Sequence, residues 1–134
     1  MTTAVPEPEL SDEDRRLLGR GMAEFNAGLF FECHDTLEEV WSGVRGSSRD
    51  FFQGLIQVAV GFYHLGNDNR SGATTMFRRA LFRLGKYGDR HAGVELSELR
   101  REVQAWLQKV EGGGPLPQGQ DALPKLVEAS PSRE

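Results

Sequence analysis

The residues that could perform chemistry lie in two stretches, one around His34 and one that ends at His64. The apolar residues that flank His34 recur at the steps of four, three and four typical of one helical face; they are Phe30, Leu37 and Trp41. This spacing predicts that His34 points into the protein core. Glu38 follows four residues later, about 40° further round the helix axis, so an imidazole and a carboxylate can share one pocket.

The second stretch is a polar stripe on an otherwise apolar helix. Gln53, Gln57, Val60 and His64 repeat the steps of four, three and four, while the other faces of the segment carry aromatic and aliphatic residues. A short connection favours antiparallel packing of this helix on the one that bears His34. The two stripes would then face each other and enclose two imidazoles, one carboxylate and two amides.

A divalent metal site is one interpretation of this arrangement. His34, Glu38 and His64 form a common set of three protein ligands for zinc or manganese and leave a fourth position for water. Water bound in this way ionises near neutral pH and can attack an ester, amide or phosphate. Glu38 would act as ligand and in catalysis, and Glu39 or Asp35 would supply a base beside the metal.

A hydrogen-bonded polar network without metal is the structural alternative. In that case Gln53 or Gln57 would hold one tautomer of a histidine, because buried polar groups need hydrogen-bond partners. The spacing does not decide between the two, since the stretch after His34 lacks the second histidine of the HExxH motif. The chain also has no Glu-x-x-His of the kind found in di-iron bundles.

Other reactive residues have simpler interpretations. Cys33 is expected to be a small buried side chain, because neighbours on a helix point about 100° apart and Cys33 cannot pair with His34. His91 lies in a polar loop and is expected to be exposed. Trp41 and Trp106 resemble core anchors, and the glycines of 66–72 lack the lysine of a phosphate-binding loop.

Helical periodicity predicts an all-α fold, a single-domain bundle of about five helices with antiparallel neighbours. The expected helices span about 11–27, 31–41, 49–65, 72–87 and 94–110, and no strand pattern interrupts them. The predicted organisation is a flexible N-terminal arm (1–10), a helical domain (11–110) and a Gly/Pro-rich tail (111–134). Within that flexible tail, residues 123–127 could dock as a short turn.

Composition limits the classes of protein. A chain of 134 residues can bury a core without staples, and its single cysteine excludes an internal disulfide and suits a cytoplasmic location. The chain lacks an apolar run of about 18 residues and a secretory signal pattern, so no membrane association is expected. The net charge of −4 makes nucleic acid an improbable partner. Basic residues nonetheless concentrate locally, at Arg79, Arg83 and Lys86.

These stretches resemble a known family. AGLFFECHDTLEEVW, followed by FFQGLIQVAVGFYHLGNDNRSGATTMFRRAL, is similar to domain of unknown function family 309, small helical proteins sometimes labelled predicted metal-dependent hydrolases. The resemblance covers about residues 12–107. The positions that match the motif of the family are Gly28, Glu32, His34, Glu38, Trp41, Gln53, Gly54, Gln57 and His64.

The resemblance implies that His34, Glu38 and His64 are functional positions, with Glu32, Trp41, Gln53 and Gln57 as binding residues around them. Two hypotheses follow. One is a divalent-metal-dependent hydrolase that acts on an unknown small molecule. The other is a non-enzymatic helical scaffold, possible as a homodimer, that binds a protein or an acidic partner through Arg79, Arg83 and Lys86.

Overall fold

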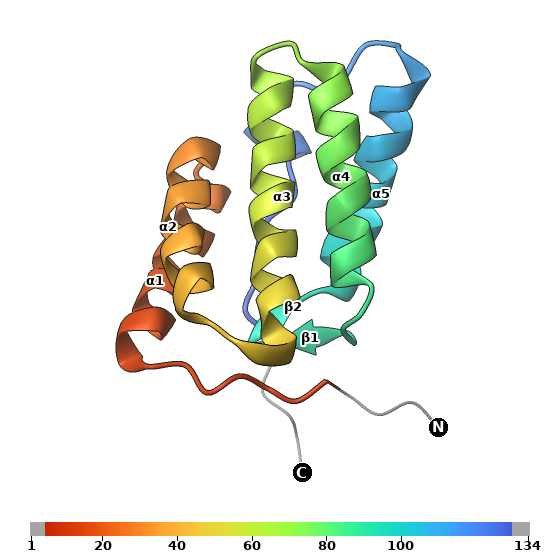
Figure 1. Cartoon of the computed structure of the whole chain (residues 1–134). Coiled ribbons are helices and arrows are strands. Elements are labelled where there is room, and N and C mark those ends of the chain that lie inside the picture. The colour runs from red at the N-terminus through yellow and green to blue at the C-terminus, as the bar shows by residue number, and fades with distance from the viewer. Residues whose placement is uncertain (1–4, 130–134) are drawn as a thin grey trace.

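The computed structural model describes residues 5–129 and consists mainly of five helices that pack side by side (Figure 1). Consecutive helices reverse direction, which confirms the predicted all-α bundle with antiparallel neighbours. The helices are α1 (Asp12–Asn26), α2 (Phe30–Gly43), α3 (Arg49–Gly66), α4 (Arg70–Leu84) and α5 (Ser97–Gly112). Short 3-10 turns, η1 (Gly46–Ser48) and η2 (Gln120–Ala122), lie before α3 and in the C-terminal segment.

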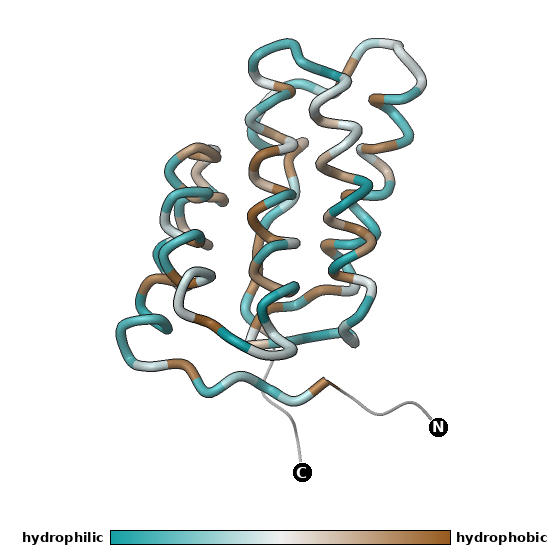
Figure 2. The backbone as a smooth tube through the Cα atoms, viewed as in Figure 1, coloured by the Kyte–Doolittle hydropathy of each residue, from teal (hydrophilic) through white to brown (hydrophobic). Residues whose placement is uncertain are grey.

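Helix α3 occupies the centre of the bundle because it is apolar around most of its circumference, as Figure 2 shows. Helix α2 packs on one side of it and α4 on the other, while α1 packs on α2 and α5 on α4. Gly54 and Gly61 allow α4 to approach closely. A Cβ atom at Gly54 would lie 2.8 Å from the side chain of Leu84, and one at Gly61 would lie 2.4 Å from Phe77.

A small β-hairpin was not predicted from the sequence. Strands β1 (Arg90–His91) and β2 (Val94–Glu95) pair antiparallel between α4 and α5, and Ala92 and Gly93 form the turn with positive φ. Two-residue strands are too short to produce an alternating pattern, so periodicity could not indicate them. The hairpin occupies the start of the segment predicted as the fifth helix, which therefore begins at Ser97.

The C-terminal segment returns along the bundle. Leu126 is buried, Asn26 exchanges two hydrogen bonds with its backbone (2.9 and 2.7 Å), and Glu128 forms a β-bridge with Val94. The predicted docking of residues 123–127 is thus observed within a tail expected to be flexible, and residues 130–134 lie outside the described part. The N-terminal arm is also tethered, since the amide of Ala92 donates to Glu7 (2.7 Å); residues 1–4 are not described.

None of the helices in the described range 5–129 is long and apolar enough to span a membrane.

Candidate functional site

Helix α2 places His34 at the edge of the buried face rather than within it. The buried residues of α2 are Cys33, Thr36, Leu37 and Val40, so the centre of the core-facing stripe lies on the Cys33 side of His34. The imidazole keeps 24% of its surface exposed, and the prediction that His34 points inward is therefore corrected. Cys33 is fully buried as predicted, and burial raises the pKa of its thiol to about 12.

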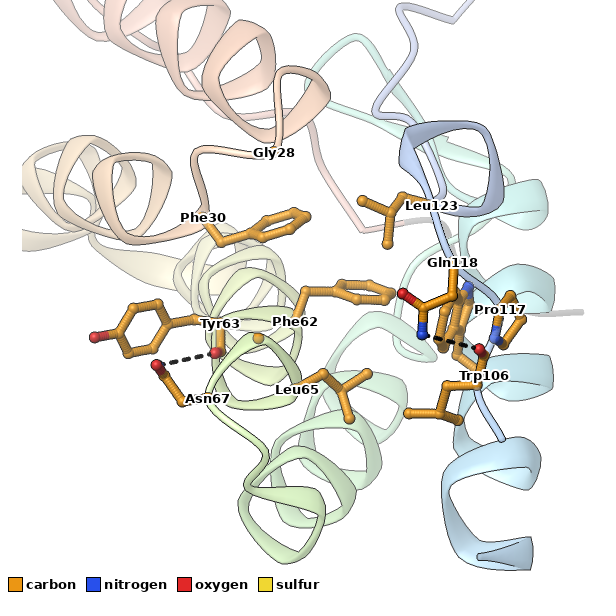
Figure 3. Close-up of a pocket in the computed structure, with 12 residues that line it drawn as sticks. Gly28, Phe30, Phe62, Tyr63, Leu65, Asn67, Trp106, Pro117, Gln118 and Leu123 are labelled. Atoms are coloured by element: carbon orange, nitrogen blue, oxygen red, sulfur yellow. Dashed lines mark hydrogen bonds between the residues drawn. The ribbon is translucent and has the colours of Figure 1, made fainter. Parts of the chain in front are cut away.

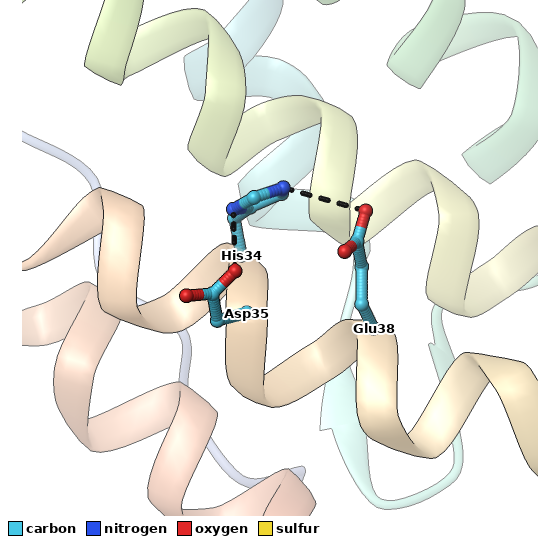
Figure 4. A group of neighbouring side chains, drawn as sticks. All are labelled: His34, Asp35 and Glu38. Carbon is cyan, nitrogen blue, oxygen red and sulfur yellow. Dashed lines mark ion pairs between the residues drawn. The ribbon is translucent and has the colours of Figure 1, made fainter.

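Two carboxylates approach the two ring nitrogens of His34 from the same helix (Figure 4). Glu38 Oε2 lies 3.3 Å from Nε2, and Asp35 Oδ1 lies 3.4 Å from Nδ1. One ligand atom from each residue lies within 4.8 Å of the others, which makes this group, among the described residues, the cluster suited to a metal ion. Both carboxylates are more than half exposed, so they remain well hydrated and free to adjust.

Hydrogen-bond acceptors lie near both ring nitrogens of His34. Nδ1 also lies 3.3 Å from the carbonyl oxygen of Phe31, which can only accept a hydrogen bond. If Nδ1 carries the proton of the neutral ring, it donates to one of these acceptors and the lone pair of Nε2 faces the Glu38 carboxylate; in the other tautomer Nε2 donates to Glu38. Two acceptors at 3.3 Å repel each other unless a cation lies between them or the imidazole is doubly protonated. With the proton on Nδ1, His34 Nε2 and Glu38 Oε2 are therefore two neighbouring electron-pair donors that could hold a cation.

His64 lies on α3 across a small apolar pocket from His34. The pocket has a volume of about 140 Å³, and both histidines line it together with Phe30, Phe31, Val60 and Tyr63. The packing of α2 on α3 thus brings the two predicted histidines to one pocket, but Glu38, Gln53 and Gln57 do not line it. His64 does not belong to the group within 4.8 Å, however, whose third member is Asp35. Its Nδ1 is 3.3 Å from the side-chain amide of Asn69.

The remaining predicted site residues lie outside the cluster. Glu32 and Glu39 are exposed, and Gln53 is half-buried. Gln57 is buried, and its Oε1 atom has no hydrogen-bond partner. Trp41 is half-buried beneath the guanidinium of Arg49, 3.8 Å from its ring centre, so its main contact is a cation–π interaction.

Two aromatic residues beside the histidines were missed in the sequence. Phe31 and Tyr63 are 50% and 41% exposed, and their ring centres are 5.6 Å apart. Phe31 precedes His34 by three residues and Tyr63 directly precedes His64. Their position next to each histidine is the signal that could have identified them, because aromatic residues left partly exposed beside polar groups are typical of binding surfaces.

His91 is buried, which contradicts the exposed position expected for it. The side chain is 2% exposed, its Nε2 atom lies 2.8 Å from Ser48 Oγ, and its Nδ1 atom lies 3.8 Å from Glu7. Loss of hydration lowers the pKa of His91, and the nearby Glu7 carboxylate opposes that change. The polar composition of the loop gave no sign of this burial, because the ring is covered by Phe51 from α3 and by Tyr87 from the preceding loop.

The basic face predicted for an acidic partner is largely paired within the molecule. Arg83 and Lys86 both form ion pairs with Asp50. The hydrogen bond from Lys86 and the charge of Arg83 hold the pKa of Asp50 below its usual value. Arg79, the third predicted basic residue, is exposed, and no ion pair is described for it.

Two uncharacterised bacterial proteins are similar to this chain. One, from Aquifex aeolicus (strain VF5), is 26% identical over 103 residues, which cover 76% of this chain and 31% of that protein. The other, the uncharacterised protein YpuF of Bacillus subtilis (strain 168), is 36% identical over 62 residues, or 45% of this chain and 36% of that protein. The matches thus span about a third of the length of these relatives.

The model of domain of unknown function family 309 (DUF309) matches residues 18–76. That segment runs from α1 into α4 and includes His34, Glu38 and His64, whereas the hairpin, α5 and the C-terminal segment lie beyond it. Residues 18–76, which carry both His34 of α2 and His64 of α3, are therefore similar to the DUF309 family.

Proposed function

We propose that this protein binds a divalent metal ion at His34 and Glu38 and uses it to hydrolyse a small-molecule substrate at the α2–α3 face. The observation that carries the proposal is the 3.3 Å approach of Glu38 Oε2 to His34 Nε2, with Asp35 at the other ring nitrogen. A neutral imidazole with its proton on Nδ1 turns a lone pair toward a carboxylate, and a divalent ion would relieve that repulsion.

The donor atoms suit zinc or manganese. One imidazole nitrogen with carboxylate oxygens is a normal donor set for these ions, and a histidine ligand usually donates its other N–H to a carboxylate or a carbonyl. Here Asp35 and the Phe31 carbonyl would take that N–H and keep His34 in the tautomer that offers Nε2. Such an ion, when bound, supplies Lewis acidity toward a carbonyl or phosphoryl oxygen.

The other residues of the site would bind and orient the substrate. Phe31 and Tyr63 offer partly exposed rings at the entrance of the 140 Å³ pocket. His64, on the opposite wall, remains the proposed third ligand, or it exchanges a proton with the substrate through Nε2. Glu39 is exposed and one position round the helix from Glu38, so we assign it no part in the site.

Glu38→Gln and Glu39→Gln form a matched pair of neighbouring exposed residues with the same chemical change. Protein purified without chelator in zinc- or manganese-supplemented medium is analysed for metal by mass spectrometry. We expect about one ion per chain in the wild type and in Glu39→Gln, and at least a tenfold loss in Glu38→Gln and His34→Ala. A loss of bound metal in His64→Ala would show that α3 also supplies a ligand.

Hydrolysis is measured separately with 4-nitrophenyl acetate and 4-nitrophenyl phosphate, before and after chelation. A rate that falls on chelation and in Glu38→Gln supports the proposal. Absence of metal in the supplemented wild type, together with a His34 imidazole that titrates as a hydrogen-bonded pair by NMR, would instead establish the metal-free polar network.

The non-enzymatic scaffold remains the second candidate, now on a different surface. Because Arg83 and Lys86 already pair with Asp50, an acidic partner would find mainly Arg79 on that face. Charge reversal of Arg79 should abolish capture of an acidic partner if that hypothesis is correct, and it should leave metal binding unchanged.

A further inference from the structure

A second, larger cavity lies behind the proposed site, between the bundle and the C-terminal segment (Figure 3). Its volume is about 430 Å³, within the usual size range of small-molecule pockets. Its walls come from the start of α2, the end of α3, α5 and the C-terminal segment. The apolar side chains that project toward the common space are those of Phe30, Phe62, Leu65, Trp106 and Leu123.

The lining of this cavity favours a neutral, apolar occupant. None of the described residues that line it carries a charge. Its polar side chains are those of Tyr63 and of two amides that already have partners: Asn67 donates to the Tyr63 carbonyl (3.2 Å) and Gln118 donates to the Leu116 carbonyl (3.4 Å). Phe30 and Phe62 stack with ring centres 5.4 Å apart, and Trp106 meets Phe62 edge-on at 5.4 Å. Such rings accept another flat or branched apolar group by the same contacts.

The outer wall is held in place at both ends. Arg70 donates to the carbonyl groups of Val110 and Gly114 where the segment leaves α5. At the other end, the side chain of Asn26 forms two hydrogen bonds with the backbone of Leu126. Between these anchors, Gln120 donates to the Ala27 carbonyl (3.2 Å). The C-terminal segment is therefore attached to the helical bundle on both sides of the cavity and forms a fixed wall.

Glycine at position 28 contributes to this closure. Gly28 has φ of 80°, and a Cβ atom there would lie 2.6 Å from the side-chain nitrogen of Gln120. A larger residue would strain the turn and would also displace the Gln120 amide that donates to the Ala27 carbonyl.

The cavity adjoins the proposed metal site. Phe30 and Tyr63 line both this cavity and the smaller pocket that contains His34 and His64. One molecule could therefore place an apolar group behind these two rings and a polar, reactive group in front of them.

We propose that the larger cavity binds a neutral aromatic or branched aliphatic group of the substrate, and that this substrate is an ester or amide. This inference rests on the proposed hydrolytic function. In the reaction the acyl carbon–oxygen or carbon–nitrogen bond breaks, the hydroxyl group of water joins the acyl carbon, and the remaining proton goes to the leaving alcohol or amine. Water is the co-reactant, and nothing is oxidised or reduced.

Trp106 provides a direct measurement of occupancy that needs neither metal nor turnover. The chain has two tryptophans, so Trp41→Phe leaves Trp106 as the fluorescent reporter and keeps an aromatic ring beneath Arg49. The chelator-treated full chain is titrated with 4-nitrobenzyl alcohol, a neutral aromatic quencher, and in parallel with the anion 4-nitrobenzoate. We expect saturable quenching by the alcohol and at least tenfold weaker binding of the anion.

Leu123→Asp and Val127→Asp are matched variants in the same segment. Leu123 lines the cavity, whereas Val127 is exposed and does not. Leu123→Asp should weaken binding of the alcohol at least tenfold and Val127→Asp less than twofold. Leu116→Phe fills part of the cavity without adding charge and should also weaken binding. Its effect would show that Leu123→Asp does not act only by detaching the C-terminal segment from the bundle. Circular dichroism checks that each variant is folded.

Linear, non-saturable quenching, or equal quenching in all three variants, would overturn the cavity proposal whatever the metal analysis shows. Saturable, Leu123-dependent binding in a protein that holds no metal and does not hydrolyse 4-nitrobenzyl acetate would refute the hydrolase while leaving the apolar binding site established.

Discussion

At the scale of single residues, two histidines differ from the sequence prediction in how deeply they are buried. His34 was expected in the interior but lies at its edge, 24% exposed, where two carboxylates can reach it. His91 was expected in solvent but is buried against Phe51 and Tyr87. The two histidines thus differ in their role: one is accessible to a ligand, and the other joins the N-terminal arm and the start of α3.

The burial of His91 predicts a pH dependence of stability. Because burial lowers its pKa below the unfolded value of about 6.5, the folded state binds fewer protons than the unfolded state. The contribution of His91 to the free energy of unfolding is therefore complete above pH 6.5 and is lost as the pH falls through its folded pKa. Urea unfolding between pH 7.5 and 5 should show this loss, and His91→Gln should reduce it.

Ser48→Ala tests the same contact at constant pH. It removes the hydroxyl 2.8 Å from His91 Nε2 and leaves a buried polar atom without its partner, so we expect a loss of about 1–3 kcal/mol. Ser47→Ala is the control, since Ser47 is an exposed neighbour. Equal stability of the two variants would contradict the structural role of the contact.

At the scale of elements, the close packing of α3 on α4 depends on glycines in α3. Gly61 faces Phe77, where a Cβ atom would stand 2.4 Å from the ring. Gly19 in α1 has no atom within 4 Å of an added Cβ. There is therefore no room for a side chain at Gly61, whereas there is open space for one at Gly19.

Gly61→Ala and Gly19→Ala should consequently change stability in opposite directions. The first overpacks the α3–α4 contact and should cost about 1–3 kcal/mol. The second improves helix propensity at an exposed position and should add about 0.5–1 kcal/mol. Urea unfolding of both variants gives the comparison, and a stable Gly61→Ala would show that the helices can separate without loss.

At the scale of the whole molecule, the C-terminal segment connects the two ends of the fold. Asn26 at the end of α1 binds Leu126, one hundred residues later, and Val94 of the hairpin pairs with Glu128. The segment thereby forms the outer wall of the larger cavity. A region of Gly and Pro without helical periodicity thus becomes part of the structure through distant contacts.

Asn26→Ala should release this segment. Loss of the two backbone hydrogen bonds should cost about 1–3 kcal/mol locally and should increase amide hydrogen exchange at Leu126 and its neighbours. Gln108→Ala, an exposed change on α5, is the control and should leave exchange unchanged. Unaltered exchange in Asn26→Ala would mean that burial of Leu126 alone holds the segment.

The sequence by itself determined the five helices, their antiparallel order and the placement of His34 and His64 on facing helices. These features depend on apolar periodicity within one helix and on short connections, both of which are local. The burial of Cys33 follows from the same pattern.

Only the tertiary structure decided that His34 lies at the edge of the buried face of α2, with 24% of its side chain exposed. The tertiary structure also decided the burial of His91 and the docking of the C-terminal segment. Each of the last two depends on partners 43 to 100 positions away in the chain, such as Ser48 with His91 and Asn26 with Leu126. Periodicity describes one segment at a time, so it cannot specify which distant side chain will cover a polar loop.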